Sequence, residues 1–444
     1  MMDPTRVIGG PAADPFGLTA GAAGDPHRTQ LGGPGGLQFE AVPGNRYALS
    51  TEHAREHVLL RGVASAAMAG RRLPLNLCLV IDRSGSMEGE PLEYVKRACH
   101  YVVDLLDPND ILSVVTFETA VDVVMPARRV INRQLIKEHL NRIQPGNTTN
   151  LYDGLVVGGQ QIASVPSGGY VNRMILFTDG EPTAGIRDFQ SIVSAVQELK
   201  NRGISVTALG FGPEYNEELL AGMARRSGGN YYYISRPDLI PEVFRTELDQ
   251  LLTITAKNLR LRLYTSRWVQ VRQIYGHPLT YGERMVEVVL PDLERGAVVS
   301  AVAELEFGPR PAGTFRVARA DLVYDDCVTG AQGVTLSQDV VFEFTPDRSL
   351  VAQHANPVVQ QELEIARASR SLERTMMGIK TQQISPTVAL AELQKTQMLL
   401  TSQGRHAEAA EVGQAIAAMQ QGSGDVEKTL IGTIVDLDLG KRKA

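Results

Sequence analysis

The stretch LNLCLVIDRSGSM, residues 75–87, joins a mostly apolar run to a loop of small polar residues. A short apolar run of this kind is typical of a strand that is buried on both faces of a parallel sheet. Asp82 ends the run, and Ser84 and Ser86 follow it at alternate positions. In extended backbone this spacing can turn three oxygen-bearing side chains toward one point. The stretch therefore predicts a buried strand followed by a loop that is suited to hold a cation.

The same apolar character recurs in residues 111–117, 173–180 and 204–212. The segments between these runs have helical patterns, and helices are predicted over residues 91–106, 133–143, 151–163, 189–202 and 216–226. Strands that alternate with helices predict a doubly wound, mostly parallel sheet of the α/β class, here over residues 74–252. In such a sheet ligands bind at the carboxyl ends of the strands.

The segments on both sides of this domain have the pattern of antiparallel strands. Residues 256–346 alternate apolar and polar side chains between Gly, Pro and Asp, which predicts a β-sandwich. The short strands predicted over residues 45–73 have no neighbours of their own, so we expect them to pair with the later ones. The α/β domain is then an insertion in an antiparallel β-sandwich domain that is split in the sequence.

Three further segments complete the predicted organisation. Residues 1–44 are rich in Gly, Pro and Ala and are predicted to form a disordered arm. Residues 357–421 carry apolar side chains at helical spacing, which predicts C-terminal helices. Residues 422–444 are interpreted as a flexible tail.

Composition restricts the classes of function. Lys and Arg total 44 against 50 Asp and Glu, a formal net charge of -6, which gives no long-range attraction toward nucleic acid or anionic lipid. No stretch approaches the roughly 20 apolar residues of a membrane helix, and the first residues lack a signal-peptide pattern. Three cysteines, Cys78, Cys99 and Cys327, are few and odd in number, which favours reduced thiols. We therefore expect a cytoplasmic protein that neither binds nucleic acid nor inserts into a membrane.

The Asp82 loop alone supplies too few ligands for a cation. Thr149 lies just before a predicted helix and Asp179 ends another apolar strand, so three loops can converge at one edge of the sheet. Carboxylate and hydroxyl oxygens suit a hard divalent cation, with Mg²⁺ as the best fit and Mn²⁺ or Ca²⁺ as alternatives. The simpler alternative is that Asp82 and Ser84 form a helix cap and that Asp179 begins a turn.

The motifs DRSGSM, TTNLYDGL and LFTDGEP, in this order on this strand pattern, resemble those of the von Willebrand factor type A domain with its metal-ion-dependent adhesion site. The resemblance covers the whole predicted α/β domain. Asp82, Ser84 and Ser86 match the family's Asp-x-Ser-x-Ser signature. Thr149 matches its single threonine, and Asp179 matches its closing aspartate.

This resemblance implies how the site would work. In the family the hydroxyls usually bind the metal directly and the aspartates bind partly through water, while an Asp or Glu of a protein partner fills the remaining position. Thr148 is the alternative to Thr149 in this set. The layout of the flanking strands also resembles bacterial type A domain proteins and, more distantly, the inter-alpha-trypsin inhibitor heavy chains. We therefore expect a non-enzymatic binding or scaffold protein.

An enzymatic alternative comes from a different motif. HAREH, residues 53–57, has the His-x-x-Glu-His spacing of a class of zinc metallopeptidases, which requires both histidines on one face of a helix. The residues that follow the motif predict a strand instead. Ser84 and Ser86 also lack the Gly-x-Ser-x-Gly context and the histidine partner of a nucleophile, so catalysis is not predicted.

The C-terminal tail suggests a signalling alternative. Thr429 and Thr433 lie in a segment flanked by glycines, and Asp436 follows Thr433 by three residues. The segment resembles phosphothreonine sites that forkhead-associated domains read, so phosphorylation would make the chain a regulated signalling component. The alternative is an ordinary terminal strand, because IGTIVDLDL, residues 431–439, is rich in β-branched residues.

Overall fold

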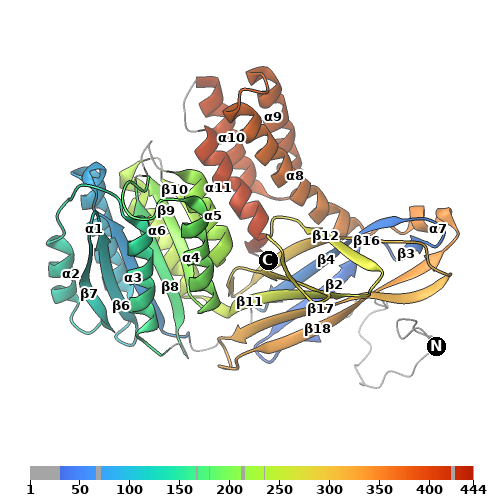
Figure 1. The fold of residues 1–444 in the computed structure, drawn as a ribbon, viewed down its shortest axis with the longest axis horizontal. Coiled ribbons are helices and arrows are strands. Elements are labelled where there is room, and N and C mark those ends of the chain that lie inside the picture. The colour runs from blue at the N-terminus through green and yellow to red at the C-terminus, as the bar shows by residue number, and fades with distance from the viewer. Residues whose placement is uncertain are drawn as a thin grey trace.

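The computed structural model describes residues 31–66, 72–166, 169–179, 181–211, 216–234, 236–421 and 426–443. An α/β domain lies at one end of the molecule and a β-sandwich at the other, with the C-terminal helices rising beside their junction (Figure 1). The predicted fold class, a doubly wound sheet inserted in a β-sandwich and followed by helices, is confirmed.

The sheet of the α/β domain has the strand order β10-β9-β8-β5-β6-β7. Its strands are β5 (Leu75–Asp82), β6 (Ile111–Phe117), β7 (Val121–Arg129), β8 (Val171–Thr178), β9 (Ser205–Phe211) and β10 (Tyr231–Ile234). All neighbours are parallel except β7, which runs antiparallel to β6. Every residue of β5 is buried, as the continuous apolar run at this position predicts.

Helices cover both faces of this sheet (Figure 1). They are α1 (Glu90–Leu105), α2 (Arg133–Asn141), α3 (Leu151–Ala163), α4 (Phe189–Asn201), α5 (Glu217–Ser227) and α6 (Ile240–Leu251). Side chains of β5 alternate between the two cores: Val80 packs with α3 and α4, and Leu79 packs with α1 and α6. The five predicted helices are present, whereas the edge strands β7 and β10 and the last helix α6 were not predicted.

Strands from before and after the α/β domain form one sheet of the sandwich, in the order β1-β2-β4-β16-β12. Strand β4 (Ala54–Ala64) pairs antiparallel with β16 (Ala297–Phe307) along its whole length, so the inserted domain leaves the sheet intact. The other members are β1 (Leu31–Gly32), β2 (Leu37–Pro43) and β12 (Val269–Ile274), and β19 (Lys441–Lys443) pairs with β16.

The second sheet has the order β13-β14-β11-β17-β18-β3. Its strands are β3 (Tyr47–Leu49), β11 (Ile254–Thr265), β13 (Thr280–Gly282), β14 (Met285–Val289), β17 (Gly313–Asp326) and β18 (Val334–Thr345), and β15 (Leu293–Glu294) pairs with β11. Alternate side chains of the two sheets form a common core.

The prediction of a disordered arm over residues 1–44 is wrong for its last part. Residues 31–43 contribute β1 and β2, and β2 pairs with β4 from Leu37 to Pro43. Phe39 is among the most buried side chains of the sandwich. Burial against strands that lie far away in the sequence supplies the stabilisation that the composition did not indicate. Residues 1–30 lie outside the described residues.

The C-terminal region is helical, as predicted, but the helices extend into the expected tail. They are α7 (Arg348–Gln353), α8 (Pro357–Lys380), α9 (Pro386–Ser402), α10 (His406–Gln421) and α11 (Val426–Leu439). Leu430, Ile431 and Ile434 of α11 are buried in the core that also contains α5 and β10 of the α/β domain. The interpretation of 422–444 as flexible is therefore wrong for residues 426–443, and a helix replaces the alternative terminal strand because packing overrides the β-branched composition.

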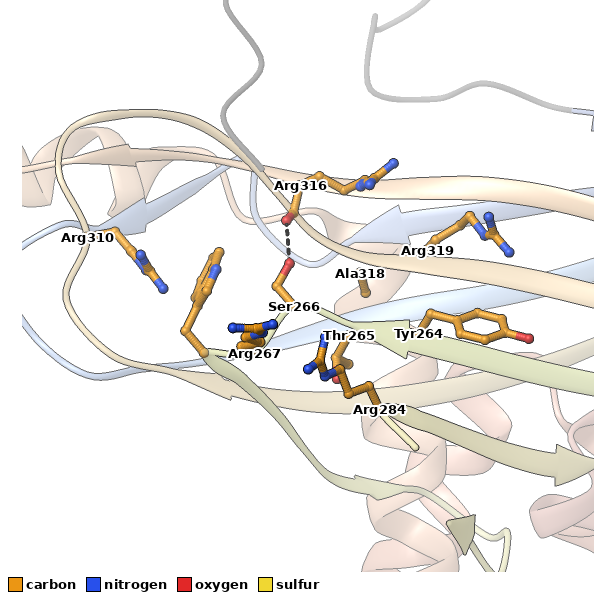
Figure 2. Close-up of a pocket in the computed structure, with 10 residues that line it drawn as sticks. Tyr264, Thr265, Ser266, Arg267, Arg284, Arg310, Arg316, Ala318 and Arg319 are labelled. Carbon is orange, nitrogen blue, oxygen red and sulfur yellow. Dashed lines mark hydrogen bonds between the residues drawn. The ribbon is translucent and has the colours of Figure 1, made fainter. Parts of the chain in front are cut away.

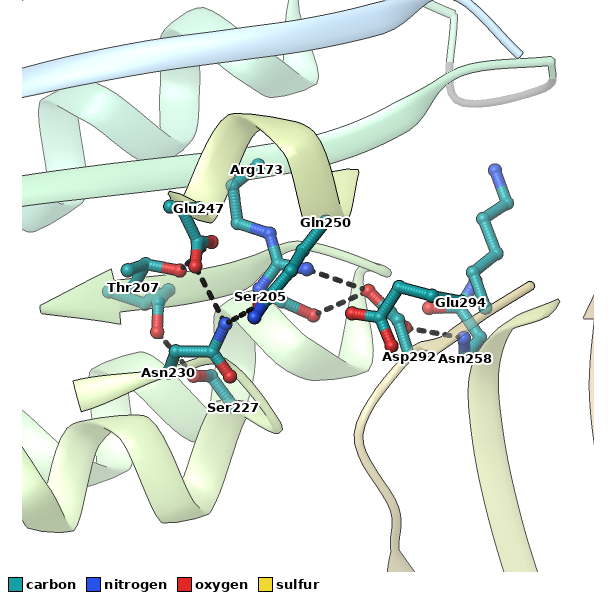
Figure 3. A network of polar contacts seen from close by, with 12 residues as sticks. Arg173, Ser205, Thr207, Ser227, Asn230, Glu247, Gln250, Asn258, Asp292 and Glu294 are labelled. Carbon is teal, nitrogen blue, oxygen red and sulfur yellow. Dashed lines mark hydrogen bonds and ion pairs between the residues drawn. The ribbon is translucent and has the colours of Figure 1, made fainter. Parts of the chain in front are cut away.

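A buried ion-pair cluster joins the α/β domain to the sandwich (Figure 3). The guanidinium of Arg173 lies 3.1 Å from the carboxylate of Asp292, and the amine of Lys200 lies 3.7 Å from it. The backbone N–H of Asn258 donates to the same carboxylate over 3.1 Å. Burial alone would raise the pKa of Asp292, but the two cations outweigh it and hold the pKa below its usual range.

A neighbouring polar cluster centres on Glu247 of α6 (Figure 3). Its carboxylate accepts hydrogen bonds from the hydroxyl of Thr207 at 2.6 Å, the amide of Asn230 at 2.6 Å and the phenol of Tyr232 at 3.0 Å. Three donors compensate for the loss of solvation of this buried carboxylate. The cluster therefore fixes α6 against β9 and β10.

No helix among the described residues is both long and apolar enough to cross a membrane.

Candidate metal centre

Asp82 lies at the carboxyl end of β5 and is held between two strands. Its carboxylate accepts the backbone N–H of Ser84 through Oδ1 at 2.8 Å and the hydroxyl of Thr178 through Oδ2 at 2.7 Å. Thr178 ends β8, the parallel neighbour of β5. The carboxylate is fully buried at the edge of the sheet where the strands end.

Ser84 and Ser86 connect Asp82 to the third loop. Their hydroxyl oxygens lie 3.2 Å apart, and the hydroxyl of Ser86 donates to Oδ1 of Asp179 over 2.8 Å. A single turn of 3-10 helix, Gly85–Met87, produces this arrangement, so the serines are not in continuous extended backbone. Hydrogen bonds thus link the loop after β5 with the loop after β8, as the sequence predicts for these four residues.

Thr149 belongs to the loop before α3, which lies against both of the other loops. Its carbonyl oxygen accepts the N–H groups of Thr183 and Ala184 at 3.0 and 3.2 Å, and its own N–H donates to the hydroxyl of Thr183 at 2.8 Å. Gly85 donates its N–H to the carbonyl of Asn147 at 3.1 Å. These contacts place the backbone of Thr149 beside the loop that follows Asp179.

The choice between the two adjacent threonines depends on burial. Thr149 is buried, and Asn150 directly after it caps α3 by accepting the N–H of Asp153. The hydroxyl of Thr148 instead donates to the hydroxyl of Thr119 over 2.9 Å at an exposed position. Burial therefore favours Thr149 over Thr148 as the candidate.

The electrostatics of these groups fit a cation. The pKa of Asp82 is raised to about 6, because burial and, to a smaller extent, the charge of Asp179 outweigh the hydrogen bonds from Thr178 and Ser84. Two carboxylates held close together with little solvent repel each other unless a positive charge lies between them. Two carboxylates and three hydroxyls are also the oxygen donors that Mg²⁺ prefers. The donor set therefore fits a hard divalent cation.

The family model that describes the von Willebrand factor type A domain matches residues 76–246. These residues form a type A domain. The match begins at the second residue of β5 and ends within α6, so it contains all three loops of the candidate site.

Curated proteins with similar sequences share this domain. An uncharacterized protein of Synechocystis is 34% identical over 204 residues, which are 45% of this chain and 48% of that protein. The uncharacterized protein YfbK of Escherichia coli is 30% identical over 203 residues, 45% of this chain and 35% of that protein. Human inter-alpha-trypsin inhibitor heavy chain H4 is 30% identical over 166 residues, 35% of this chain and 18% of that protein. The matches thus span about half of these relatives or less.

Two solved structures share the fold well beyond the type A domain. A von Willebrand factor type A protein from Catenulispora acidiphila has a TM-score of 0.69 at 17% identity, covering 85% of this chain and 88% of that chain. The ArnB paralog VWA2 from Sulfolobus acidocaldarius has a TM-score of 0.65 at 18% identity, covering 90% and 98%. The combination of type A domain, sandwich and helices is therefore a fold that recurs in other proteins.

Residues that the sequence did not single out position the loops of the type A domain. Thr178 binds the carboxylate of Asp82, and Thr183 fixes the backbone of Thr149. Arg83 follows Asp82 directly in the sequence. Its guanidinium lies 2.8 Å from the carboxylate of Asp122 and 3.5 Å from that of Glu118, so its charge is paired outside the set of candidate ligands. Of these three residues, only Thr178 could have been suspected from the sequence, because it directly precedes Asp179.

The zinc-peptidase alternative does not have the helix that it needs. Residues 54–64 form strand β4, so His57 lies in a strand, and His53 precedes it. Strand geometry separates side chains four residues apart by about 13 Å, too far for both to bind one zinc ion. Within the described parts of the chain, no cluster of three or more His, Cys, Asp or Glu residues is placed to hold a metal. The motif is part of the sandwich.

The two tail threonines lie in a helix, and one of them is inaccessible to a kinase. Both lie in α11, and the side chain of Thr433 is fully buried, where its hydroxyl donates to Glu411 at 2.8 Å and to the carbonyl of Thr429 at 3.2 Å. A phosphate on Thr433 would place a dianion beside this carboxylate inside the helical core, which costs stability. The expectation of an accessible phosphorylation site is therefore wrong for Thr433.

Proposed function

We propose that this chain is a divalent-cation-dependent protein-binding or scaffold protein. The type A domain is typically a protein-interaction module. Its proposed metal ligands are Asp82, Ser84, Ser86, Thr149 and Asp179, and Mg²⁺ is the proposed ion, with Mn²⁺ or Ca²⁺ as alternatives. The observation that carries the proposal is the hydrogen-bonded series from Asp82 to Asp179, which joins the ends of two neighbouring strands.

The chemistry of the site explains the kind of partner. Two carboxylates neutralise a divalent ion only formally, and a coordination position that the chain leaves to water would still accept one further anionic oxygen. An Asp or Glu side chain of a partner protein meets this need and gives a directional contact. The guanidinium of Arg83 pairs with Asp122 and Glu118, and so it does not take the place of the cation beside Asp82. Loops around the site would supply the remaining specificity.

Calorimetry on the full chain tests the metal site. After treatment with a chelator and its removal, the protein should bind about one equivalent of Mg²⁺ or Mn²⁺. Asp82→Ala and the milder Ser86→Ala should lose or weaken this binding, whereas Asp104→Asn, which removes an exposed carboxylate of α1 that pairs with Lys137, should leave it unchanged. Unaltered stoichiometric binding by folded Asp82→Ala protein would contradict the assignment.

Affinity capture then tests the partner-binding step. Proteins retained by the wild-type chain in Mg²⁺, but not in EDTA and not by Ser86→Ala, are candidate ligands. Replacing single Asp or Glu residues of such a ligand with Asn or Gln should abolish retention at one position. If every acidic residue can be replaced without effect, the proposed mode of contact is wrong.

A further inference from the structure

Figure 2 shows an arginine-rich hollow in the β-sandwich. The hollow lies at the end of the sandwich away from the type A domain. Strand β11 leaves the junction at Ile254 and ends at Thr265, and at about 3.3 Å per residue this strand carries the chain roughly 35–40 Å. The hollow has a volume of about 810 Å³, which is within the range of ligand sites. Five guanidinium groups surround it: Arg267, Arg284, Arg310, Arg316 and Arg319.

Only part of this positive charge is compensated. Arg319 lies 2.8 Å from Asp321, and Arg316 lies 3.4 Å from Asp339 in a solvent-exposed pair. The guanidinium groups of Arg267 and Arg284 have no ion pair or hydrogen bond with any residue that the structure describes. Two uncommitted cations therefore lie at one hollow in a chain whose net charge is -6. Their combined charge corresponds to that of one phosphate dianion.

An aromatic side chain with a buried N–H is part of the lining of the hollow. The indole of Trp268 lines it, and the indole N–H is buried without an acceptor among the described residues. The ring is fixed by edge-on contacts with Phe307 and Phe344, at centroid distances of 5.9 and 5.8 Å. The nitrogen has almost no exposed surface, so a ligand in the hollow meets the ring and not this donor.

The backbone around the hollow is already ordered. Ser266, in the turn between β11 and β12, donates its N–H to Val317 at 3.1 Å and its hydroxyl to the carbonyl of Arg316 at 3.0 Å. Arg284 keeps φ at 57° in the two-residue turn between β13 and β14, a conformation that favours glycine or asparagine. An arginine in this conformation carries a backbone cost, which a function of its side chain would offset.

We propose that this hollow binds a phosphorylated segment of a partner protein. Planar guanidinium groups bind phosphate oxygens in pairs, and arginine clusters are a recurrent means of phosphopeptide recognition. A single carboxylate would leave one of the two uncommitted charges unneutralised. A nucleotide is the weaker alternative, because the guanidinium of Arg310 lies 4.0 Å above the ring of Trp268 and occupies the face on which a base would stack.

Trp268 provides a direct readout, because it is the only tryptophan of the chain. The full chain, in EDTA so that the metal site does not contribute, is titrated with random-sequence peptide libraries that carry a central phosphoserine or phosphothreonine. Unphosphorylated libraries, inorganic pyrophosphate and ATP are titrated in parallel. We expect the phosphorylated peptides to change the tryptophan emission and to bind with micromolar affinity, and the unphosphorylated peptides to do neither.

Two double variants decide the assignment. Arg267→Gln with Arg284→Gln should weaken phosphopeptide binding about a hundredfold. Arg128→Gln with Arg129→Gln removes the same two charges from the exposed edge strand β7 and should change nothing. The proposal is overturned if the libraries bind regardless of phosphate, if only ATP or pyrophosphate binds, or if the two double variants behave alike.

Discussion

Ser86 donates its hydroxyl hydrogen to Asp179 over 2.8 Å, although 93 residues separate them in the chain. The contact closes the candidate metal site between the ends of β5 and β8. It also suggests a substitution that changes the charge of this side chain but keeps its size and its hydrogen bond. Asn in place of Asp179 keeps an acceptor for Ser86 while it removes one of the two negative charges.

We therefore predict that Asp179→Asn folds normally but loses the metal-dependent part of its stability. A ligand at a hundred times its dissociation constant stabilises a folded protein by about 2.7 kcal/mol, so saturating Mg²⁺ should raise the wild-type melting temperature by several degrees. The variant should show almost no rise. Differential scanning calorimetry with and without Mg²⁺ measures this, and an equal rise in both proteins would rule out a ligand role for Asp179.

The loops of the type A domain could be predicted because their signals are local. An apolar run that ends in Asp82, and another that ends in Asp179, each indicate a strand end, and parallel strands place such ends at one edge. Asn150 and Asp188 cap α3 and α4 through their side chains, as residue preferences at helix starts indicate. The element bounds in this domain consequently agree with the prediction to within a few residues.

The errors lie where distant segments decide the structure. Residues 37–43 become a strand because β4 and the rest of the sandwich are there to pair with them. Residues 426–439 become a helix because Leu430 and Ile434 find a core built by α5, α8 and α10. Neither partner is visible from the segment itself, and weak local preferences give way to tertiary packing.

The buried cluster at the domain junction predicts a large cost for removing its anion. Asp292→Ala would leave Arg173 and Lys200 buried without their counter-ion, and we expect a loss of about 3–5 kcal/mol in the free energy of unfolding. Glu198→Ala removes the partner of Arg202 from a pair that is more than half exposed, and should cost less than about 1 kcal/mol. Urea denaturation of the two variants measures the difference, and similar losses would contradict the role given to the junction.

Asp436 predicts a pH dependence of stability. Burial raises its pKa to about 8, with Glu411 and Glu408 of α10 adding to the rise and Arg405 and Lys441 opposing it. The folded protein thus holds a proton that the unfolded chain releases above its usual pKa near 3.8. The stability that this proton contributes is fully present below pH 3.8 and is lost progressively as the pH rises to about 8.

Asp436→Asn should remove this loss. We expect the variant to gain stability relative to the wild type as the pH rises from 5 to 8, by at most about 1.4 kcal/mol per pH unit. Guanidinium denaturation of both proteins at pH 5 and pH 8 gives the difference in their free energies of unfolding. The contributions of other titrating groups largely cancel in this difference. Asp249→Asn changes an exposed carboxylate that lines the same cavity as Asp436 and should show no such trend. A variant whose advantage is the same at pH 5 and pH 8 would mean that Asp436 titrates normally.

Arg284 predicts a substitution that raises stability and lowers binding together. Its φ of 57° suits glycine, so Arg284→Gly should relieve a conformational cost of about 1 kcal/mol and raise the melting temperature. The same change removes one of the two uncommitted guanidinium groups at the hollow and should weaken phosphopeptide binding about tenfold. Arg267→Gly provides the comparison, because no positive φ favours glycine there, so the added freedom of the unfolded chain should lower its stability while binding falls as well. If Arg284→Gly raises the melting temperature and weakens binding, the side chain serves the ligand and not the fold. If the variant loses both stability and binding, the side chain supports the fold.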